Sequence, residues 1–347
     1  ALAAVNLRDP RRLRKAAAAL ALASLAIALY GFIQYLGMDV RRWAIGYGGQ
    51  RPFSTLGNPN YLAGYFAVLA PWAVSMFLAS RDPVGKASWM MVSFAWLVLI
   101  LVAQTRGAWL ACAASLSWLL WSGARRDPGG TAAQRGWLVA LGLVLLLAGA
   151  WAGVKNKDLA YRIADAVPRD FGQVARRLTN MRAALLTLRD HPFAGLGPGC
   201  FKHAYGMRMA AVMPVSEMTQ FTRTYSEEYV HCDYLQILAE CGVAWFGLLA
   251  WLAVAAARTL IWAGSGERRL AEVLLAGGIA FAVHGAFNQP LRIAPTAFLF
   301  WLGIGLAARP SCRVKPEPTI GRAPRMATAV ASLAVLAVGL AGALILA

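Results

Sequence analysis

Three basic side chains lie in or beside the polar segments that separate the apolar stretches of this sequence. His231 lies where a long polar segment gives way to an apolar stretch, and histidine is the common side chain that exchanges a proton near neutral pH. Arg106 lies in the short polar break between two apolar stretches, and Arg182 lies in the long polar segment. Arginine has a planar, permanently charged fork that matches phosphate oxygens. If all three meet at one membrane face, they indicate a site for a phosphate-bearing lipid.

Arg106 also has a simpler interpretation, whereas Arg182 does not. Arg106 in the tight break Gln104-Thr105-Arg106-Gly107 can be a helix-end arginine whose charged head reaches water. Arg182 belongs to segment 172–190, in which apolar residues recur every three or four positions and predict an amphipathic helix. At about 100° per residue, Arg182 lies roughly 40° from Leu178, at the border of the apolar stripe. Helix-terminus electrostatics explain Arg189 but do not explain Arg182.

Other polar residues are candidates for supporting roles. Glu227 or Glu228, one turn before His231, can orient its imidazole, although carboxylates also stabilise a helix's first turn. Asn58 and Asn60 in Gly57-Asn58-Pro59-Asn60 are first of all helix-start residues, with a site-lining role as the alternative. His284 is either a packing residue or part of a polar cavity wall. We interpret His191 and His203, both in loop sequence, as structural.

The composition predicts that these residues belong to a membrane protein. Hydrophobic residues make up 59 % of the 347, charged residues 14 %, and the mean hydropathy is +0.52. These values exclude an ordinary soluble domain. Because backbone groups in lipid must pair within a span, we predict an all-α, polytopic protein of about nine transmembrane helices. The predicted spans are 16–36, 60–80, 88–104, 107–122, 137–154, 233–257, 271–288, 293–308 and 326–347.

The distribution of charge predicts the orientation. With the amino terminus of this chain in the cytoplasm, eighteen Lys and Arg residues fall in inner segments and five in the short outer ones. That asymmetry follows the positive-inside rule, so the net charge of +18 needs no nucleic-acid partner. The chain starts at Ala1 without an initiator methionine, so we expect a processed or shortened amino terminus.

Segment 155–230 is too long to be a passive connection, and we expect it to be a helical outer loop. Cys200 and Cys232 both lie on the outer side, where they are either a disulfide or two separate thiols. No CxxC or HExxH spacing is present, so we expect neither a metal site nor a cofactor.

Four segments, taken in order, resemble the bacterial O-antigen ligase and polymerase family. They are RPFSTLGNPNYLAGYF, QTRGAWLA, RDHPFAGLGPGCF and HCDYLQILAECG, within residues 51–247. His231, Cys232 and Gly242 fit the ligase spacing, although Cys232 replaces the usual Asn, Ser or Gln. Arg182 with Leu186, and the earlier Arg106, match the family's arginines. The resemblance implies a GT-C-like fold, with one membrane domain over 1–347 and a periplasmic loop or lid at 155–230 between spans five and six.

The resemblance also implies a function. It is transfer of a glycan from undecaprenyl diphosphate to an acceptor hydroxyl, with inversion and without metal, at the periplasmic face of the bacterial inner membrane. Arg106 and Arg182 would bind the diphosphate, and His231 would act on the acceptor. We favour a ligase whose acceptor is the lipid A–core. A polysaccharide polymerase, a protein O-oligosaccharyltransferase, a lipid-glycan flippase and a scaffolding protein stay open as alternatives.

Overall fold

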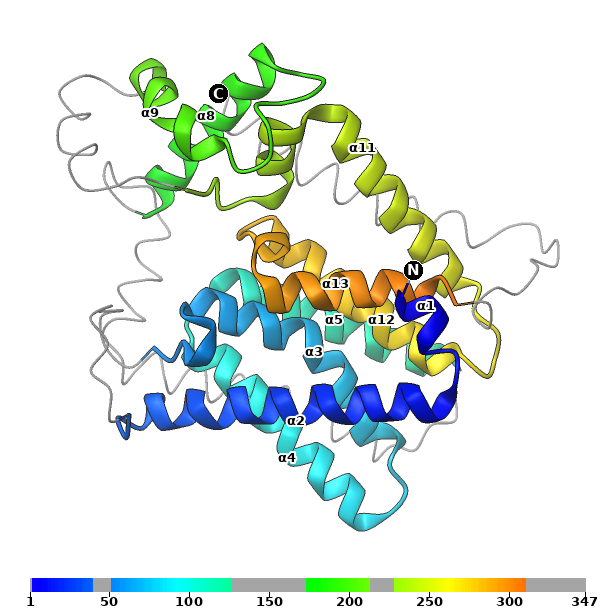
Figure 1. The fold of residues 1–347 in the computed structure, drawn as a ribbon. Helices are drawn as coiled ribbons and strands as arrows, with labels where there is room; N and C mark the ends of the chain where they lie inside the picture. Colours follow the sequence, from blue (N-terminus) through cyan, green and yellow to red (C-terminus); the bar gives the residue numbers. More distant parts are fainter. Residues whose placement is uncertain (1, 40–50, 127–172, 213–227, 310–347) are drawn as a thin grey trace. The chain divides into compact units, whose positions relative to one another are not determined.

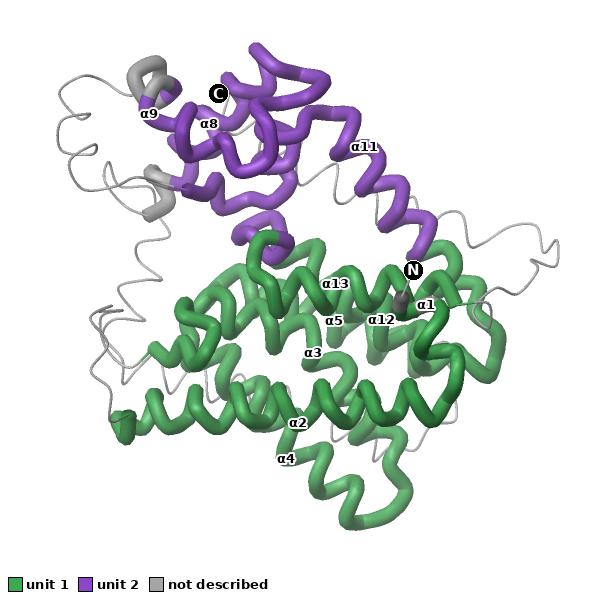
Figure 2. The backbone as a smooth tube through the Cα atoms, in the orientation of Figure 1, with its two compact units in different colours: residues 1–161, 257–284, 292–319 green, residues 162–256, 285–291, 320–347 purple. Residues whose placement is uncertain are grey.

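A computed structural model describes residues 2–39, 51–126, 173–212 and 228–309 (Figure 1). Every regular element in these ranges is helical, and none of the described residues forms a strand. The chain divides into two compact units (Figure 2). Unit 1 comprises 1–161, 257–284 and 292–319, and unit 2 comprises 162–256, 285–291 and 320–347. The described part of the chain therefore has the all-α class that the sequence predicts.

Three long apolar helices begin with the same signal, an Asx residue followed by proline. Asp9 caps α2 (Pro10–Tyr35), Asn58 caps α3 (Pro59–Ala79) and Asp82 caps α4 (Pro83–Val102). In each case the capping side chain accepts a hydrogen bond from a backbone N–H of the first turn. Proline suits the next position because its missing N–H would have no partner in the helix. The predicted start of a span at Asn58-Pro59 is thus confirmed.

Four described helices are long and apolar enough to cross a membrane: α2, α3, α4 and α11 (Asp233–Ile261). Protein buries 72 % of the most apolar window of α3 but only 17 % of that of α2. In unit 1, α3 is therefore the central helix. Its neighbours α2 and α4 leave apolar faces outside the protein interior, as lipid-facing helices do.

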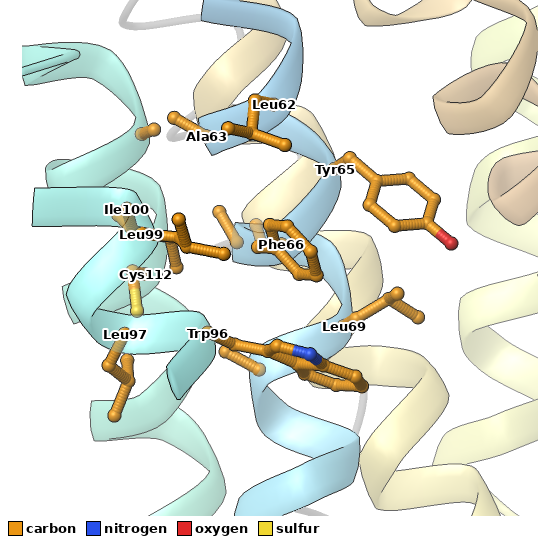
Figure 3. Packing of buried hydrophobic residues seen from close by; sticks show 14 of the residues in the cluster. Leu62, Ala63, Tyr65, Phe66, Leu69, Trp96, Leu97, Leu99, Ile100 and Cys112 are labelled. Carbon is orange, nitrogen blue, oxygen red and sulfur yellow. The ribbon is translucent and has the colours of Figure 1, made fainter. Parts of the chain in front are cut away.

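The core of unit 1 lies around α3 and its neighbours α4 and α5 (Arg106–Arg126). Phe66 and Trp96 are fully buried, with ring centroids 5.5 Å apart (Figure 3). Leu62 and Leu99 extend the same cluster, which also contains Cys112 of α5. This packing fixes the ends of α4 and α5, which carry the Arg106 hairpin.

The other described helices of unit 1 are the short α1 (Leu2–Asn6) and η1 (Ser54–Leu56), α12 (Arg268–Gly285), which ends at the unit boundary, and α13 (Ala294–Ala307). Glu267 and Arg309, which flank α12 and α13, form an ion pair at 3.2 Å, and the Arg309 side chain is 3 % exposed. A short helix, η2 (Pro290–Arg292), connects α12 to α13.

Unit 2 contains α8 (Gln173–Asp190), α9 (Phe201–Val212) and the first part of α11. Its core combines Ala183, Phe201, Val230 and Leu235 with their neighbours. The predicted helix at 172–190 is confirmed as α8. Its most buried residues, however, are Asn180, Ala183, Ala184 and Thr187 rather than the predicted Leu and Met stripe. Small side chains allow close approach of the neighbouring backbone, and the larger side chains of the stripe are only partly buried.

Several predicted boundaries change. The segment after Gly199 is helical, so His203 lies in α9 and not in a loop. Helix α11 begins at Asp233, so His231 precedes the helix instead of opening it, and Glu228 lies outside the first turn. The predicted spans near 107–122, 271–288 and 293–308 coincide with α5, α12 and α13. The spans at 137–154 and 326–347 lie outside the described residues, so the number of nine stays a prediction.

Candidate functional site

Arg106 begins α5 directly after a three-residue turn that follows α4. Gln104 in this turn has a φ of 53°, which reverses the chain sharply. The Trp109 indole N–H donates to the Ile100 carbonyl oxygen at 2.9 Å and ties the two helices together across the turn. Arg106 itself is exposed at the tip. The tight hairpin that the sequence predicts is confirmed, and it leaves the guanidinium accessible at a helix end.

Arg51 supports this hairpin from the segment before α3. Its Nε and Nη2 atoms donate to the Ala103 carbonyl oxygen at 3.0 and 2.7 Å. Asn60 Oδ1 accepts from Arg51 at 3.4 Å and from the Thr105 hydroxyl at 3.0 Å. These hydrogen bonds therefore connect Arg51 and Asn60 to the turn at residues 103–105, immediately before Arg106.

No site role is predicted for Arg51 from the sequence, because nothing local identifies the Ala103 carbonyl as its partner. Asn60 contacts the hairpin through the Thr105 hydroxyl, whereas Asn58 is a helix cap, and a site-lining role for either residue stays a prediction.

His231 lies two residues before α11 in an uncommon backbone conformation. Its φ is 62°, in the left-handed region that residues with a Cβ rarely adopt. The side chain is half-buried, between the buried Val230 and Cys232. Such a conformation persists where the surroundings impose it, and here hydrogen bonds hold the chain on both sides of the histidine.

Before His231, the side chain of Gln236 binds the backbone. Gln236 Oε1 accepts from the Val230 N–H at 2.8 Å, and Nε2 donates to the Glu228 carbonyl oxygen at 3.3 Å. After His231, Asp233 anchors the start of α11. Its N–H donates to the Asn288 carbonyl oxygen at 3.1 Å, and its Oδ2 accepts from the Leu291 N–H at 2.7 Å. The turn at His231 is thus fixed from two directions within unit 2.

Arg182 lies on the exposed side of α8, and its helix contacts the chain that leads to His231. Asn180 is fully buried, donates to the Tyr229 carbonyl oxygen at 3.2 Å and accepts from the Tyr205 hydroxyl at 2.7 Å. At about 100° per residue, Arg182 points roughly opposite to Asn180 and about 100° away from Ala183. The guanidinium of Arg182 is therefore available to a ligand outside the core of unit 2.

A glycine-rich turn between α8 and α9 packs against α11. Residues 191–200 lie against the middle of α11, where Gly242 has a φ of 72° and interrupts the helical conformation. The Val243 N–H, which the kink frees, donates to the Pro192 carbonyl oxygen at 2.8 Å. The Ala239 and Glu240 carbonyl oxygens of α11 accept hydrogen bonds from the N–H groups of Leu196 and Gly197, respectively. The chain after Arg182 is therefore bound to the helix that follows His231.

Cys232 and Cys200 are both free thiols. Burial in the core of unit 2 is the main cause that raises the pKa of the Cys232 thiol, to about 11. At neutral pH this group is protonated and is a poor nucleophile. Of the two interpretations that the sequence left open, the structure has separate thiols.

The other candidates differ in position. Glu228 is exposed in non-helical chain, and Glu227 lies outside the described residues. His284 is 2 % exposed and packs against α3, where a Cβ on Gly64 would lie 2.3 Å from its Nε2 atom. Within the described ranges, no group of three or more His, Cys, Asp or Glu residues is arranged to hold a metal ion.

The candidate residues thus fall into two groups. Asn58, Asn60, Arg106 and His284 belong to unit 1, whereas Arg182, Glu228 and His231 belong to unit 2. Hydrogen bonds connect Asn60 to the Arg106 hairpin, and they connect the helix of Arg182 to the chain before His231. The convergence of all three basic groups stays a prediction.

Residues 89–252 match the family model described as O-antigen ligase. No curated protein matches the chain. The matched segment runs from α4 into α11 and contains Arg106, Arg182 and His231 together.

Proposed function

Since this match supports the O-antigen ligase and polymerase family for the chain, we propose that the protein is a membrane glycosyltransferase with a polyprenyl-diphosphate-linked glycan as donor. The observation that carries the proposal is that a single family match contains all three basic candidates, Arg106, Arg182 and His231. The four long apolar helices agree with an enzyme whose donor is a membrane lipid. We place the site at the periplasmic face of the bacterial inner membrane, on the basis of the positive-inside distribution.

Arg106 and Arg182 bind the donor diphosphate in this proposal. Both side chains are exposed. Arg106 lies at the tip of the hairpin, and Arg182 lies on the exposed side of α8. A charge-assisted hydrogen bond contributes about 1.5–3 kcal/mol, and more where water is excluded. When the anomeric C–O bond breaks, negative charge grows on the leaving diphosphate. The arginines therefore stabilise the transition state more than the bound substrate.

His231 takes the proton from the acceptor hydroxyl. The hydroxyl oxygen forms a bond to the anomeric carbon as the bond to the diphosphate breaks, so the configuration at that carbon inverts. The proton moves to the imidazole, and undecaprenyl diphosphate leaves with the bonding electrons. General-base catalysis of this kind contributes typically about 10²–10⁴ in rate. The fixed left-handed turn at His231 suits such a role, because a catalytic base must be held at a defined position.

Among the acceptors, we favour the lipid A–core, which makes the enzyme an O-antigen ligase. The spacing of His231 and Gly242 supports this choice. In the structure Gly242 is the residue at which the glycine-rich turn reaches α11. That geometry gives the glycine of the motif a physical function in forming the site.

The test is reconstitution of the purified chain in liposomes with an undecaprenyl-diphosphate glycan and one acceptor at a time. Lipid A–core, a second lipid-linked glycan and a protein acceptor are compared. We expect transfer to lipid A–core, and loss of about 10²-fold or more in Arg106→Ala, Arg182→Ala and His231→Ala.

Arg189→Ala is the matched control for Arg182→Ala, because Arg189 is exposed on the same side of α8 seven residues later. His203→Ala, at an exposed position of α9, is the control for His231→Ala. Transfer to another glycan alone would identify a polymerase. Movement of the lipid-linked glycan between leaflets without transfer would identify a flippase. Undiminished transfer by the three site variants would contradict the assignment of the site.

A further inference from the structure

Two buried polar side chains, Gln236 and Glu240, lie four residues apart in the first turns of α11. They are 0 % and 1 % exposed, and each is surrounded by apolar residues of the unit 2 core. A carboxylate or amide in such a place persists only when its hydrogen bonds are made. The match to the family gives neither residue a role.

The hydrogen bonds of these two residues form a continuous chain. The Val230 N–H donates to Gln236 Oε1 at 2.8 Å, and Gln236 Nε2 donates to Glu240 Oε1 at 3.0 Å. The Gly199 N–H donates to Glu240 Oε2 at 2.8 Å. We call this chain the 236–240 bridge. One end holds the residue immediately before His231, and the other end holds the glycine-rich turn that follows the helix of Arg182.

The bridge has a fixed order of donors and acceptors. Both of its ends are backbone N–H groups, which only donate. Between them it needs three acceptor positions and one donor position, and one amide together with one carboxylate supplies that set. Two amides leave one N–H facing another, and two ionised carboxylates place acceptor against acceptor. The pair Gln and Glu therefore fits, and it also fits in the reverse order.

We propose that Gln236 and Glu240 are positioning residues of the site, which fix the left-handed turn at His231 to the glycine-rich turn 191–200. They act through backbone N–H groups and not on the substrate. This inference rests on the proposed function, because it assigns His231 the role of base. It adds to that function a reason why the imidazole is held in one place.

The experiment uses the full chain in liposomes and compares Gln236→Glu, Glu240→Gln and the double variant that exchanges the two residues. Glu240→Gln places one N–H against another, whereas Gln236→Glu keeps the order only while the two carboxyls share one proton. The double variant restores the order from Val230 to Gly199, although it loses the hydrogen bond from Gln236 Nε2 to the Glu228 carbonyl oxygen. We expect kcat to fall about 10–100-fold in Glu240→Gln, because displacement of a catalytic group by about 1 Å has such an effect, and to fall less in Gln236→Glu. We expect the KM for the donor to change less than kcat. In the double variant, kcat should rise at least about threefold above that of Glu240→Gln, as coupled sites do.

Thr187→Val is the control for a general loss of buried hydrogen bonding. Thr187 is fully buried in α8, and its hydroxyl donates to the Ala183 carbonyl oxygen at 2.9 Å. Valine has the same shape and lies outside the bridge. We expect Thr187→Val to retain kcat even where its melting temperature falls as far as that of Glu240→Gln. Equal loss of kcat in Thr187→Val would show that the bridge residues act only through stability, and would overturn the proposal.

A second measurement needs no transfer reaction. Cys232 is buried immediately after His231, so opening of the turn exposes its thiol. The labelling of Cys232 by a maleimide, followed by peptide mass spectrometry, should accelerate in both single variants and slow again in the double variant. If the single variants fail to fold, the test rests on the double variant. A folded and active double variant supports the bridge, and a double variant that also fails to fold overturns it.

The outcomes separate the two proposals. No transfer by the unaltered protein removes the proposed function, and the labelling of Cys232 then decides the bridge alone. Transfer by the unaltered protein, together with an unchanged kcat in Glu240→Gln or a double variant no better than Glu240→Gln, removes the bridge alone.

Discussion

Gly242 of α11 and Phe193 of the preceding turn approach so closely that a Cβ on the glycine would lie 2.1 Å from the Phe193 carbonyl oxygen. From the other side, a Cβ on Gly195 would lie 2.3 Å from the Glu240 carbonyl carbon. Both glycines also have positive φ values, of 72° and 65°. Two backbones thus meet without side chains between them, and the turn that follows Arg182 rests directly on the helix that follows His231.

Gly242→Ala should therefore be strongly destabilising. The added Cβ meets backbone atoms that have no room to move, in a conformation that alanine rarely adopts. Together these effects cost about 2–5 kcal/mol. Thermal unfolding in detergent measures the loss. Gly247→Ala is the matched control, because Gly247 lies on the same helix and a Cβ added there would have no atom within 4 Å. Equal melting temperatures for the two variants would contradict this close approach.

Arg51→Ala should lower transfer although Arg51 is not proposed to touch the substrate. It removes two hydrogen bonds to the Ala103 carbonyl oxygen, and hydrogen bonds to a charged group contribute about 1.5–3 kcal/mol. The hairpin that carries Arg106 then loses its support. We expect a lower kcat/KM in the reconstituted assay, with partial recovery in Arg51→Lys. Arg81→Ala, at an exposed position beyond α3, is the control. Unchanged kcat/KM in Arg51→Ala would show that Arg106 needs no such support.

Cys232 should react slowly with iodoacetamide at neutral pH, since the pKa of its thiol is raised to about 11. The thiolate is the reactive form, so the rate should rise about tenfold per pH unit from about pH 7 to pH 10. Peptide mass spectrometry of the labelled protein measures this rate. A rate that levels off below about pH 9 would contradict the raised pKa. Cys232→Ser should retain transfer, because the protonated thiol has no part in the proposed reaction.

Gly64→Ala and His284→Ala should be coupled. The Cβ of the first variant would lie 2.3 Å from the His284 Nε2 atom, so Gly64→Ala overpacks the interface of α3 and α12 by about 1–3 kcal/mol. In the His284→Ala background this clash is absent, and the added methyl should cost little. The free energies of unfolding of the four proteins give the coupling. Additive effects would contradict direct packing of His284 on Gly64 and would favour its alternative role in a polar cavity wall.

Local signals in the sequence predicted part of unit 1, namely the apolar runs and the start of α3 at Asn58-Pro59. The equivalent pairs Asp9-Pro10 and Asp82-Pro83 were not used, and the predicted spans 16–36 and 88–104 begin after the starts of α2 and α4. The hairpin at Arg106 is also local. The role of Arg51 is not, because its partner Ala103 lies 52 residues further along the chain.

Unit 2 was harder to predict for the same reason. The sequence periodicity favoured the Leu and Met stripe of α8 as its buried face, but the tight packing required Ala183 and Ala184. The kink at Gly242 depends on a turn about fifty residues earlier, and it has no local signal other than the glycine. Gln236 and Glu240 did leave a signal, since polar residues at a spacing of four in an apolar span indicate a buried hydrogen bond.

The most direct test of the central claim is a structure of the protein in lipid with undecaprenyl diphosphate bound, solved by electron cryomicroscopy. We predict that the guanidinium groups of Arg106 and Arg182 both lie within hydrogen-bond distance of the diphosphate oxygens, with the imidazole of His231 facing the acceptor side. A diphosphate that contacts neither arginine, or lies beyond the reach of His231, would contradict the account.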